Sequence, residues 1–309
     1  MASDDWQTRS RLTLIVAIIF SLIGLLVTLT VATMLLRRVG HRRAFSMAPV
    51  NGSIRVAPVS SSRMEPTADP IAQSGESAFE SSADQSTVSG DYTSMTKSFS
   101  LVAGSRFSIK NVTGSISVES WNEPKAEVKV IERGTDRGAH VYFINSANAV
   151  SIRAGAPENI HQDIRYEVKL PRNIGRVELN SVNGSINLSG VTGQFFIESA
   201  NGSIELNDVV GMSKVQTANG KINATLARAS DGPMEFVTAN GRIDVTIKGD
   251  FDAELDASTI HGGINIDDQL GIPVQKELVG QHARGQIGLG GPALKLTAVN
   301  GSVKLSKQQ

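Results

Sequence analysis

Cysteine is absent from the 309 residues of this sequence, and its absence excludes several classes of chemistry at once. Disulfide bonds, zinc–thiolate sites and thiol nucleophiles all require this residue. The absence does not indicate a compartment, because exported proteins often lack cysteine as well. Any site in this chain must therefore be built from other side chains.

Aromatic residues and net charge are also scarce. Aromatics make up 5% of the chain, whereas glycine occurs 29 times, a composition that suits narrow coils better than a wide globular core. The 30 basic and 30 acidic side chains give a net charge of zero. Charge therefore gives no reason to expect a nucleic acid as partner.

A short unit centred on Asn-Gly recurs through the second half of the chain. Most units have Ser or Thr two residues before the Asn, and alternating apolar residues after the Gly. The glycines at positions 184, 202, 220 and 241 are 18, 18 and 21 residues apart, which indicates a repeat architecture. The residues that we expect to form structural corners are Asn183, Gly184, Asn201, Gly202, Asn219, Gly220, Asn240, Gly241, Gly262, Asn300 and Gly301.

Each Asn-Gly predicts a sharp reversal or corner, because both residues tolerate positive φ. Two architectures fit: a meander of hairpins, or an all-β solenoid of about 18–21-residue coils that turn at Asn-Gly. Constant unit length favours the solenoid, as does the lack of a helix or second sheet to cover a wide open sheet. In a hairpin, Glu198 and Glu205 would also face each other unfavourably. We therefore expect stacked coils, with Asn on Asn, and keep the meander as the alternative.

The segment Leu12–Leu36 contains 25 residues without a charge. This length exceeds the roughly 20 apolar residues that span a bilayer, and it exceeds a signal-peptide core. The segment is therefore predicted to be a transmembrane helix that anchors the chain in the lipid bilayer. A processed signal is the weaker alternative, since Thr30-Val31-Ala32 has small residues at the spacing of a cleavage site.

Two features give opposite orientations for this anchor. The positive-inside rule places the C-terminal side in the cytoplasm, because Arg37, Arg38, Arg42 and Arg43 follow the segment and only Arg9 and Arg11 precede it. A large repeat domain behind a long linker suits the outside, and large domains translocate with limited regard to charge. We expect the repeat domain to be extracytoplasmic.

The chain divides into four parts. Residues 1–11 form a short tail, 12–36 the transmembrane helix, 37–96 a basic juxtamembrane segment and a Ser-, Pro- and Ala-rich linker, and 97–309 the β-repeat domain. The linker is expected to be disordered, because its composition buries little apolar surface. Thr113-Gly114 is a variant corner of the opening coils, and Trp121 is expected to pack in the cap over the first coil.

The C-terminal part carries three expectations. The corner glycines at positions 262 and 301 are 39 residues apart, a separation of about two coils. Lys304 and Lys307 are expected on the last, exposed strand, where lysine protects against edge pairing. Residues 288–293 match G-x-G-x-x-A, but Pro292 leads into a strand, so we expect a Gly-rich corner and no nucleotide site.

No catalytic residue, cofactor or metal site is predicted. Asp267-Asp268 fits a solvated corner, and the calcium-binding nonapeptide, the G-x-S-x-G elbow and the Walker loop are missing. His261 stands in a corner position and is expected to be a surface residue. The histidines form no metal-binding pair at i, i+4; they are His41, His140, His161, His261 and His282.

Several motifs follow one another in a characteristic order: residues 114–118 leading to Trp121, residues 166–171, the Asn-Gly units, Gly290-Gly291-Pro292, and Val299-Asn300-Gly301. This order resembles a bacterial family of adhesin-like proteins that are built from β-strand repeats and have no known function. The resemblance covers residues 99–305 and departs from the pattern at Thr113 and His261 in the Asn position and at Ala298 in the Ser/Thr position. It implies an all-β, solenoid-like fold and an envelope location, and it supplies no catalytic residues.

Three functions are compatible with these features. The first is a membrane-tethered, non-enzymatic envelope protein whose coils bind a glycan or a protein, with Lys221 and Arg242 as the positions that test one face. The second is a sensor arm whose residues 1–11 contact a cytoplasmic partner. The third, a carbohydrate-active enzyme, is disfavoured because the repeats offer isolated charges such as Asp244 and Glu205. The sequence does not determine an oligomeric state.

Overall fold

The structure is a computed structural model that describes residues 85–89, 92–133, 140–155, 163–227 and 232–308. All of them lie in one compact unit, Phe79–Gln309. The expected anchor Leu12–Leu36 lies outside the described residues, and within them no helix is long and apolar enough to span a bilayer. The membrane anchor therefore stays a prediction.

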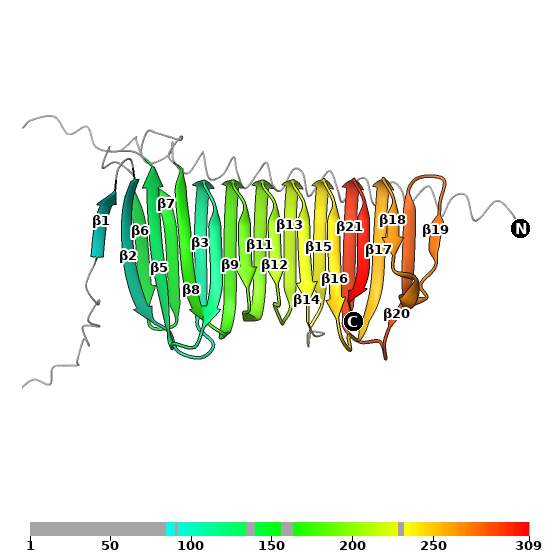
Figure 1. Cartoon of the computed structure of the whole chain (residues 1–309), viewed down its shortest axis with the longest axis horizontal. Helices are drawn as coiled ribbons and strands as arrows, with labels where there is room; N and C mark the ends of the chain where they lie inside the picture. The colour runs from blue at the N-terminus through cyan, green and yellow to red at the C-terminus, as the bar shows by residue number, and fades with distance from the viewer. Residues whose placement is uncertain (1–84, 90–91, 134–139, 156–162, 228–231, 309) are drawn as a thin grey trace, which may run out of the picture. The chain divides into compact units, whose positions relative to one another are not determined.

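The described chain forms two β-sheets of 11 strands each (Figure 1). In spatial order, sheet A contains β1 (Gln85–Ser89), β2 (Tyr92–Ser100), β5 (Lys125–Arg133), β8 (Ile164–Pro171), β4 (Ile116–Trp121), β10 (Ile186–Ser189), β12 (Ile204–Asn207), β14 (Ile222–Leu226), β16 (Ile243–Lys248), β22 (Val303–Gln308) and β18 (Ile264–Ile266). Sheet B contains β19 (Val274–Lys276), β20 (Gln281–Ile287), β17 (Ala253–His261), β21 (Ala293–Asn300), β15 (Met234–Asn240), β13 (Ser213–Asn219), β11 (Thr192–Asn201), β9 (Asn173–Asn183), β3 (Arg106–Thr113), β7 (Ala149–Gly155) and β6 (His140–Ser146). A short 3-10 helix, η2 (Asp268–Leu270), follows β18.

From β7 to β18, successive strands alternate between the two sheets, and each pairs in parallel with the equivalent strand of a neighbouring coil. β9 lies in sheet B and β10 in sheet A, and each pairs in parallel with its counterpart one coil later. The register follows the sequence period, so that Ile186 pairs with Ile204. The stack is therefore solenoid-like, as predicted, and the hairpin meander is wrong. Glu198 and Glu205 consequently lie in different sheets and do not face each other.

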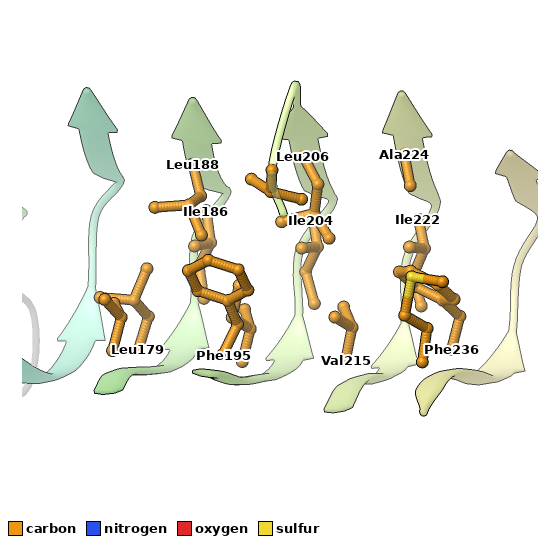
Figure 2. Close-up of a cluster of buried hydrophobic side chains, with 14 of the residues drawn as sticks. Leu179, Ile186, Leu188, Phe195, Ile204, Leu206, Val215, Ile222, Ala224 and Phe236 are labelled. Atoms are coloured by element: carbon orange, nitrogen blue, oxygen red, sulfur yellow. The ribbon is translucent and has the colours of Figure 1, made fainter. Parts of the chain in front are cut away.

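The core lies between the sheets and consists of apolar side chains at every second position of each strand (Figure 2). Ile186, Ile204 and Ile222 form a fully buried column in sheet A. Phe195 and Phe236 point toward this column from sheet B. Each side chain of this size stabilises the fold by ~1.5–3 kcal/mol relative to exposure. The continuous apolar column is therefore a main source of stability.

The corners require glycine for a reason that differs from the expected one. Among the described residues, Asp208 is the only non-glycine residue with a positive φ, so the corner asparagines do not use the left-handed region. Consecutive coils instead approach so closely that a Cβ on Gly202 would overlap the carbonyl oxygen of Gly184. A Cβ on Gly220 would overlap the carbonyl oxygen of Gly202 in the same way. Glycine is needed because only a hydrogen atom fits between the two backbones.

The opposite ends of the coils contain the residues with left-handed backbone. Gly190, between β10 and β11, has a φ of 71°, and Asp208, between β12 and β13, has a φ of 52°. Val191 and Val209 are buried in these turns and close the core at this end. The coils that contain these two turns therefore have one corner that is set by close backbone contact and one that is set by a left-handed turn.

The spatial order of the coils differs from their sequence order at both ends of the stack. At the N-terminal end, the pair β3–β4 lies between β7–β8 and β9–β10. At the C-terminal end, the pair β21–β22 lies between β15–β16 and β17–β18. Antiparallel strands complete the ends, namely β1, β2, β5 and β6 on one side and β19 and β20 on the other (Figure 1).

Two expectations about the C-terminus are wrong because of this order. Lys304 and Lys307 do not lie on an exposed last strand, since β22 pairs with β16 on one side and β18 on the other. The residues between Gly262 and Gly301 do not form two further coils; they form β18, η2 and the antiparallel pair β19–β20, and then β21. Residues 288–292 form the expected Gly-rich turn before β21.

Strands begin before the boundary that was expected at Lys97. β1 and β2 lie at the edge of sheet A, although their residues fall in the segment that was expected to be linker. β2 pairs with β5 along its whole length. A segment rich in Ser and Thr can join a sheet when a neighbouring strand offers an unpaired edge, because strand propensity depends strongly on context.

We expect Gly202→Ala to destabilise the stack by about 2 kcal/mol, because the added methyl overlaps a neighbouring backbone that cannot move aside. This corresponds to a fall of roughly 4–8 °C in the thermal midpoint of a domain of this size. Circular dichroism on heating measures it. Gly263→Ala is the matched control, since no atom lies within 4 Å of its Cβ position. Equal shifts in the two variants would contradict the close-contact explanation.

We also expect truncation after Pro292 to prevent folding, because loss of β21 and β22 removes the pairing between two interior coils. The control is an internal deletion of residues 203–220, which removes one complete 18-residue unit and leaves the remaining coils in register. Size-exclusion chromatography and circular dichroism should show a folded species of the same oligomeric state as the wild type for the deletion, and aggregate for the truncation. A soluble, cooperatively melting truncated protein would disprove the interior position of β21–β22.

Candidate functional site

The corner asparagines form a ladder of side-chain hydrogen bonds along one edge of the stack. In each step the Nδ2 group of one Asn donates to the Oδ1 atom of the preceding Asn. The donor–acceptor distances are 3.0 Å for Asn201 to Asn183, 2.9 Å for Asn219 to Asn201, 2.8 Å for Asn240 to Asn219 and 2.8 Å for Asn300 to Asn240. The amides are exposed, but the ladder already uses one donor and one acceptor of each interior residue.

A second row, made of buried hydroxyls, fixes the corner glycines. Thr217 donates to the carbonyl of Gly202 at 3.1 Å, and Thr238 donates to that of Gly220 at 3.1 Å. Ser199 and Thr259 make the equivalent bonds to the glycines at 184 and 301. These hydroxyls satisfy carbonyls that the parallel strand pairing leaves without a backbone donor. The Ser/Thr row is therefore structural.

Two departures from the repeat follow the same logic. At the Thr113 corner the Asn and hydroxyl positions are exchanged, because Asn111 donates to the carbonyls of Gly114 and Ile164. The Gly114 carbonyl, which Ser181 would otherwise bind, already accepts from Asn111. The Ser181 hydroxyl is therefore buried without a hydrogen-bond partner. Sequence reasoning missed Asn111, although its place two residues before the corner was the signal.

The ladder ends at a histidine. His261 pairs in register with Asn300 and is exposed, as expected for a surface corner residue. Gly262, the corner glycine beside it, packs against the carbonyl of Gly301. Of the other histidines, His282 contacts Asp256 at 3.0 Å, while His41 and His161 lie outside the described residues. Within the described chain no three His, Asp or Glu side chains come together as metal ligands.

The outer face of sheet B carries a row in which charges alternate in sign. Lys214, Glu235, Lys295, Asp256 and Arg284 lie in register on five neighbouring strands. Lys295 contacts Glu235 at 3.3 Å, and Arg284 contacts Asp256 at 3.1 Å. Exposed pairs of this kind contribute ~0–1 kcal/mol each. Their main effect is to offset most of the charge of this row, which keeps one net positive charge.

The outer face of sheet A contains a hollow of about 270 Å³ next to the corners. Its shape follows from the residue after each corner glycine. Along the stack this position changes from Arg242 to Ser302 to Gly263, so the side chains shorten. The hollow is lined by residues of β16, β22 and β18, namely Arg242, Asp244, Ser302, Val303, Lys304, Gly263, Ile264 and Asn265.

Charge is unbalanced in this hollow. One oxygen of Asp244, Oδ2, contacts Lys221 Nζ at 2.9 Å, while the other, Oδ1, is buried without a hydrogen-bond partner. Among the described residues, neither Arg242 nor Lys304 pairs with a carboxylate. Three cations therefore surround one carboxylate, and that carboxylate has an unused buried acceptor.

The N-terminal coils contain two aromatic side chains of different kinds. The ammonium groups of Lys125 and Lys169 each lie 5.3 Å from the centre of the Trp121 ring, and Trp121 Nε1 donates to the Lys125 carbonyl. Tyr166 is buried in the core, and burial, assisted by the charge of Glu132, raises its pKa above the ordinary range. Its hydroxyl has no hydrogen-bond partner. Trp121 is therefore half-buried at the end of β4, an interior strand of sheet A, and not on the antiparallel strands that complete this end of the stack, where it was expected. Tyr166 is a core residue.

We expect Thr238→Val to destabilise the protein by about 1–3 kcal/mol, because the Gly220 carbonyl loses its donor while the side-chain shape is kept. Ala298 occupies the equivalent position in the inserted coil, facing the corner of Gly241. We expect Ala298→Ser to stabilise it by up to about 1 kcal/mol, because the new hydroxyl can donate there. The thermal midpoint of unfolding measures both effects. A rise in the midpoint for Thr238→Val together with a fall for Ala298→Ser would refute the stabilising role of the hydroxyl row.

A comparison of this chain with models of protein families finds a match. The model of the Toastrack DUF4097 family matches residues 72–306. Among solved structures, a proposed cell adhesion protein from Clostridium sporogenes is 12% identical, with 70% of this chain and 99% of that chain covered and a TM-score of 0.44. A proposed adhesin from Bacteroides fragilis is 12% identical, with 70% and 97% covered and a TM-score of 0.37.

No curated protein matches the chain. The family match spans the Asn-Gly coils and both caps, and it confirms the resemblance to adhesin-like β-strand repeat proteins. Toastrack DUF4097 is a domain of unknown function, so membership supplies the fold and leaves the activity to be argued from the surface of this chain. The chain belongs to the Toastrack DUF4097 family.

Proposed function

We propose that this chain is a membrane-tethered, non-enzymatic protein of the cell envelope, whose solenoid serves as a scaffold or binding module. Family membership and the order of apolar segment, linker and coil stack support this function. The observation that carries it is the regular spacing of polar side chains on the outer faces. Asn187, Glu205 and Asn223, for example, follow one another in register on neighbouring strands of sheet A.

The spacing of such a row is set by the backbone. Neighbouring strands lie ~4.8 Å apart, so polar groups recur at that interval along the stack. The backbone cannot adjust this interval, because the corner glycines are in close contact. A rigid row loses little conformational freedom when it binds. A partner with its own regular polar groups, such as an envelope glycan or the edge of another protein, would fit this surface.

The proposed location rests on Leu12–Leu36, whose 25 uncharged residues match the thickness of a bilayer. Residues 37–84 then separate this segment from the first strand, β1. A spacer of that length would hold a binding module away from the membrane surface. The sensor arm remains the alternative, with the short segment before Leu12 as its cytoplasmic contact.

Protease treatment of intact cells tests the location. The protein carries a C-terminal tag after Gln309, on a flexible spacer so that pairing of β22 is undisturbed. We expect added protease to remove the tag from intact cells, or from spheroplasts if an outer layer shields it. A tagged cytoplasmic protein in the same cells is the control and should stay intact. Protection of both tags until lysis would place the solenoid in the cytoplasm and disprove the proposal.

A further inference from the structure

The hollow on sheet A has the properties of a ligand site that the stack itself does not explain. The Asn ladder and the hydroxyl row use their hydrogen bonds to hold the coils together. Arg242 and Lys304 are exposed, line the hollow and form no salt bridge with a described carboxylate. Asp244 also lines the hollow, and its Oδ1 atom is buried. The carboxylate therefore meets a ligand through Oδ2, which can accept a further hydrogen bond besides its contact with Lys221.

The hollow exists only because of the interleaved coil order. Arg242 and Asp244 come from β16, Lys304 from β22 and Asn265 from β18. In register, Asp244 lies beside Lys304, and Lys304 lies beside Asn265. If the coils followed the order of the sequence, β18 would lie next to β16, and Lys304 would lie outside this group. Insertion of β22 therefore brings the second cation next to the carboxylate.

We propose that this hollow binds a sugar unit that carries one anionic group, either a carboxylate or a phosphate. The excess of cations favours an anion, which Arg242 can bind through several N–H donors and Lys304 as a point charge. An inorganic anion brings its whole charge next to the Asp244 carboxylate and is repelled by it. A sugar can instead place its one charge near Arg242 and Lys304 and donate from a neutral hydroxyl to the Asp244 carboxylate, while Asn265 and Ser302 offer further hydrogen bonds to the ring.

The size of the hollow limits the ligand to one ring. Its volume of about 270 Å³ lies just below the ~300–1,000 Å³ of pockets that enclose drug-sized molecules. Because the hollow lies on the outer face of a sheet and not between the sheets, the rest of a polysaccharide could continue along the stack. This inference rests on the proposed function, since it names the class of envelope glycan that the solenoid would bind.

The test is a binding measurement with four small compounds. Full-length protein in lipid nanodiscs is titrated with glucose, glucuronic acid, glucose 6-phosphate and inorganic phosphate, and saturation-transfer NMR gives each Kd. We expect one or both acidic sugars to bind at least ~10-fold more tightly than glucose and than inorganic phosphate. The stronger of the two acidic sugars identifies the anionic group. Binding should also weaken as salt is added, because the attraction is electrostatic.

Two variants locate the site. Arg242→Gln and Lys304→Gln should each weaken binding of the acidic sugar ~10-fold, the loss expected for one charge-assisted hydrogen bond. Lys214→Gln removes the same charge from the outer face of sheet B and should leave the Kd unchanged. Thermal midpoints of all three should stay near that of the wild type, because none of these side chains is buried.

Several outcomes would overturn the inference. Equal affinity for glucose and glucuronic acid would remove the anionic requirement, and equal affinity for inorganic phosphate would reduce the hollow to a simple anion site. Equal weakening in Lys214→Gln would show a general charge effect. If none of the compounds binds, but protease removes the C-terminal tag from intact cells, the hollow is not a sugar site and the proposed envelope location still holds. Protection of the tag would instead reject the envelope role, whatever the affinity.

Discussion

The contact between successive corner glycines is the constraint on which the rest of this structure depends. At Gly202 and Gly220 the carbonyl of one coil lies where a Cβ of the next would be. This contact sets the distance between consecutive coils. The strands on either side of the corner therefore pair in parallel with equivalent residues in register. Parallel register in turn places like residues in columns, both in the apolar core and on the outer faces.

The polar residues at the corners serve this contact. Thr217 binds the glycine carbonyl from the inside of the coil, and Asn219 bonds to Asn201 on the outside. Both rows therefore stabilise the fold, although one of them is exposed to solvent. The outer faces of the two sheets differ from the corners, because their charged side chains vary from coil to coil. Variation of this kind allows a hollow to form at one position in the stack, between β16 and β18.

The repeat could be predicted from the sequence because each unit has its own Asn-Gly and its own alternating strand. The stacking of Asn201 on Asn183 follows from unit length alone. The spatial order of the coils does not follow from unit length, because every coil has an equivalent edge and the sequence does not indicate which edges pair. For that reason the sequence predicted an exposed strand for Lys304. The hollow could not be predicted either, since Arg242, Gly263 and Lys304 belong to coils that are not consecutive in the chain.

The interleaved ends also restrict how a protein of this kind can change in length during evolution. Between β9 and β16 the coils follow one another in sequence and in space, so duplication or loss of one unit there preserves every other contact. At either end the same event would separate strands that must close around a neighbour. Gene-level growth of the stack is therefore confined to its middle, and the two ends are inherited as complete modules.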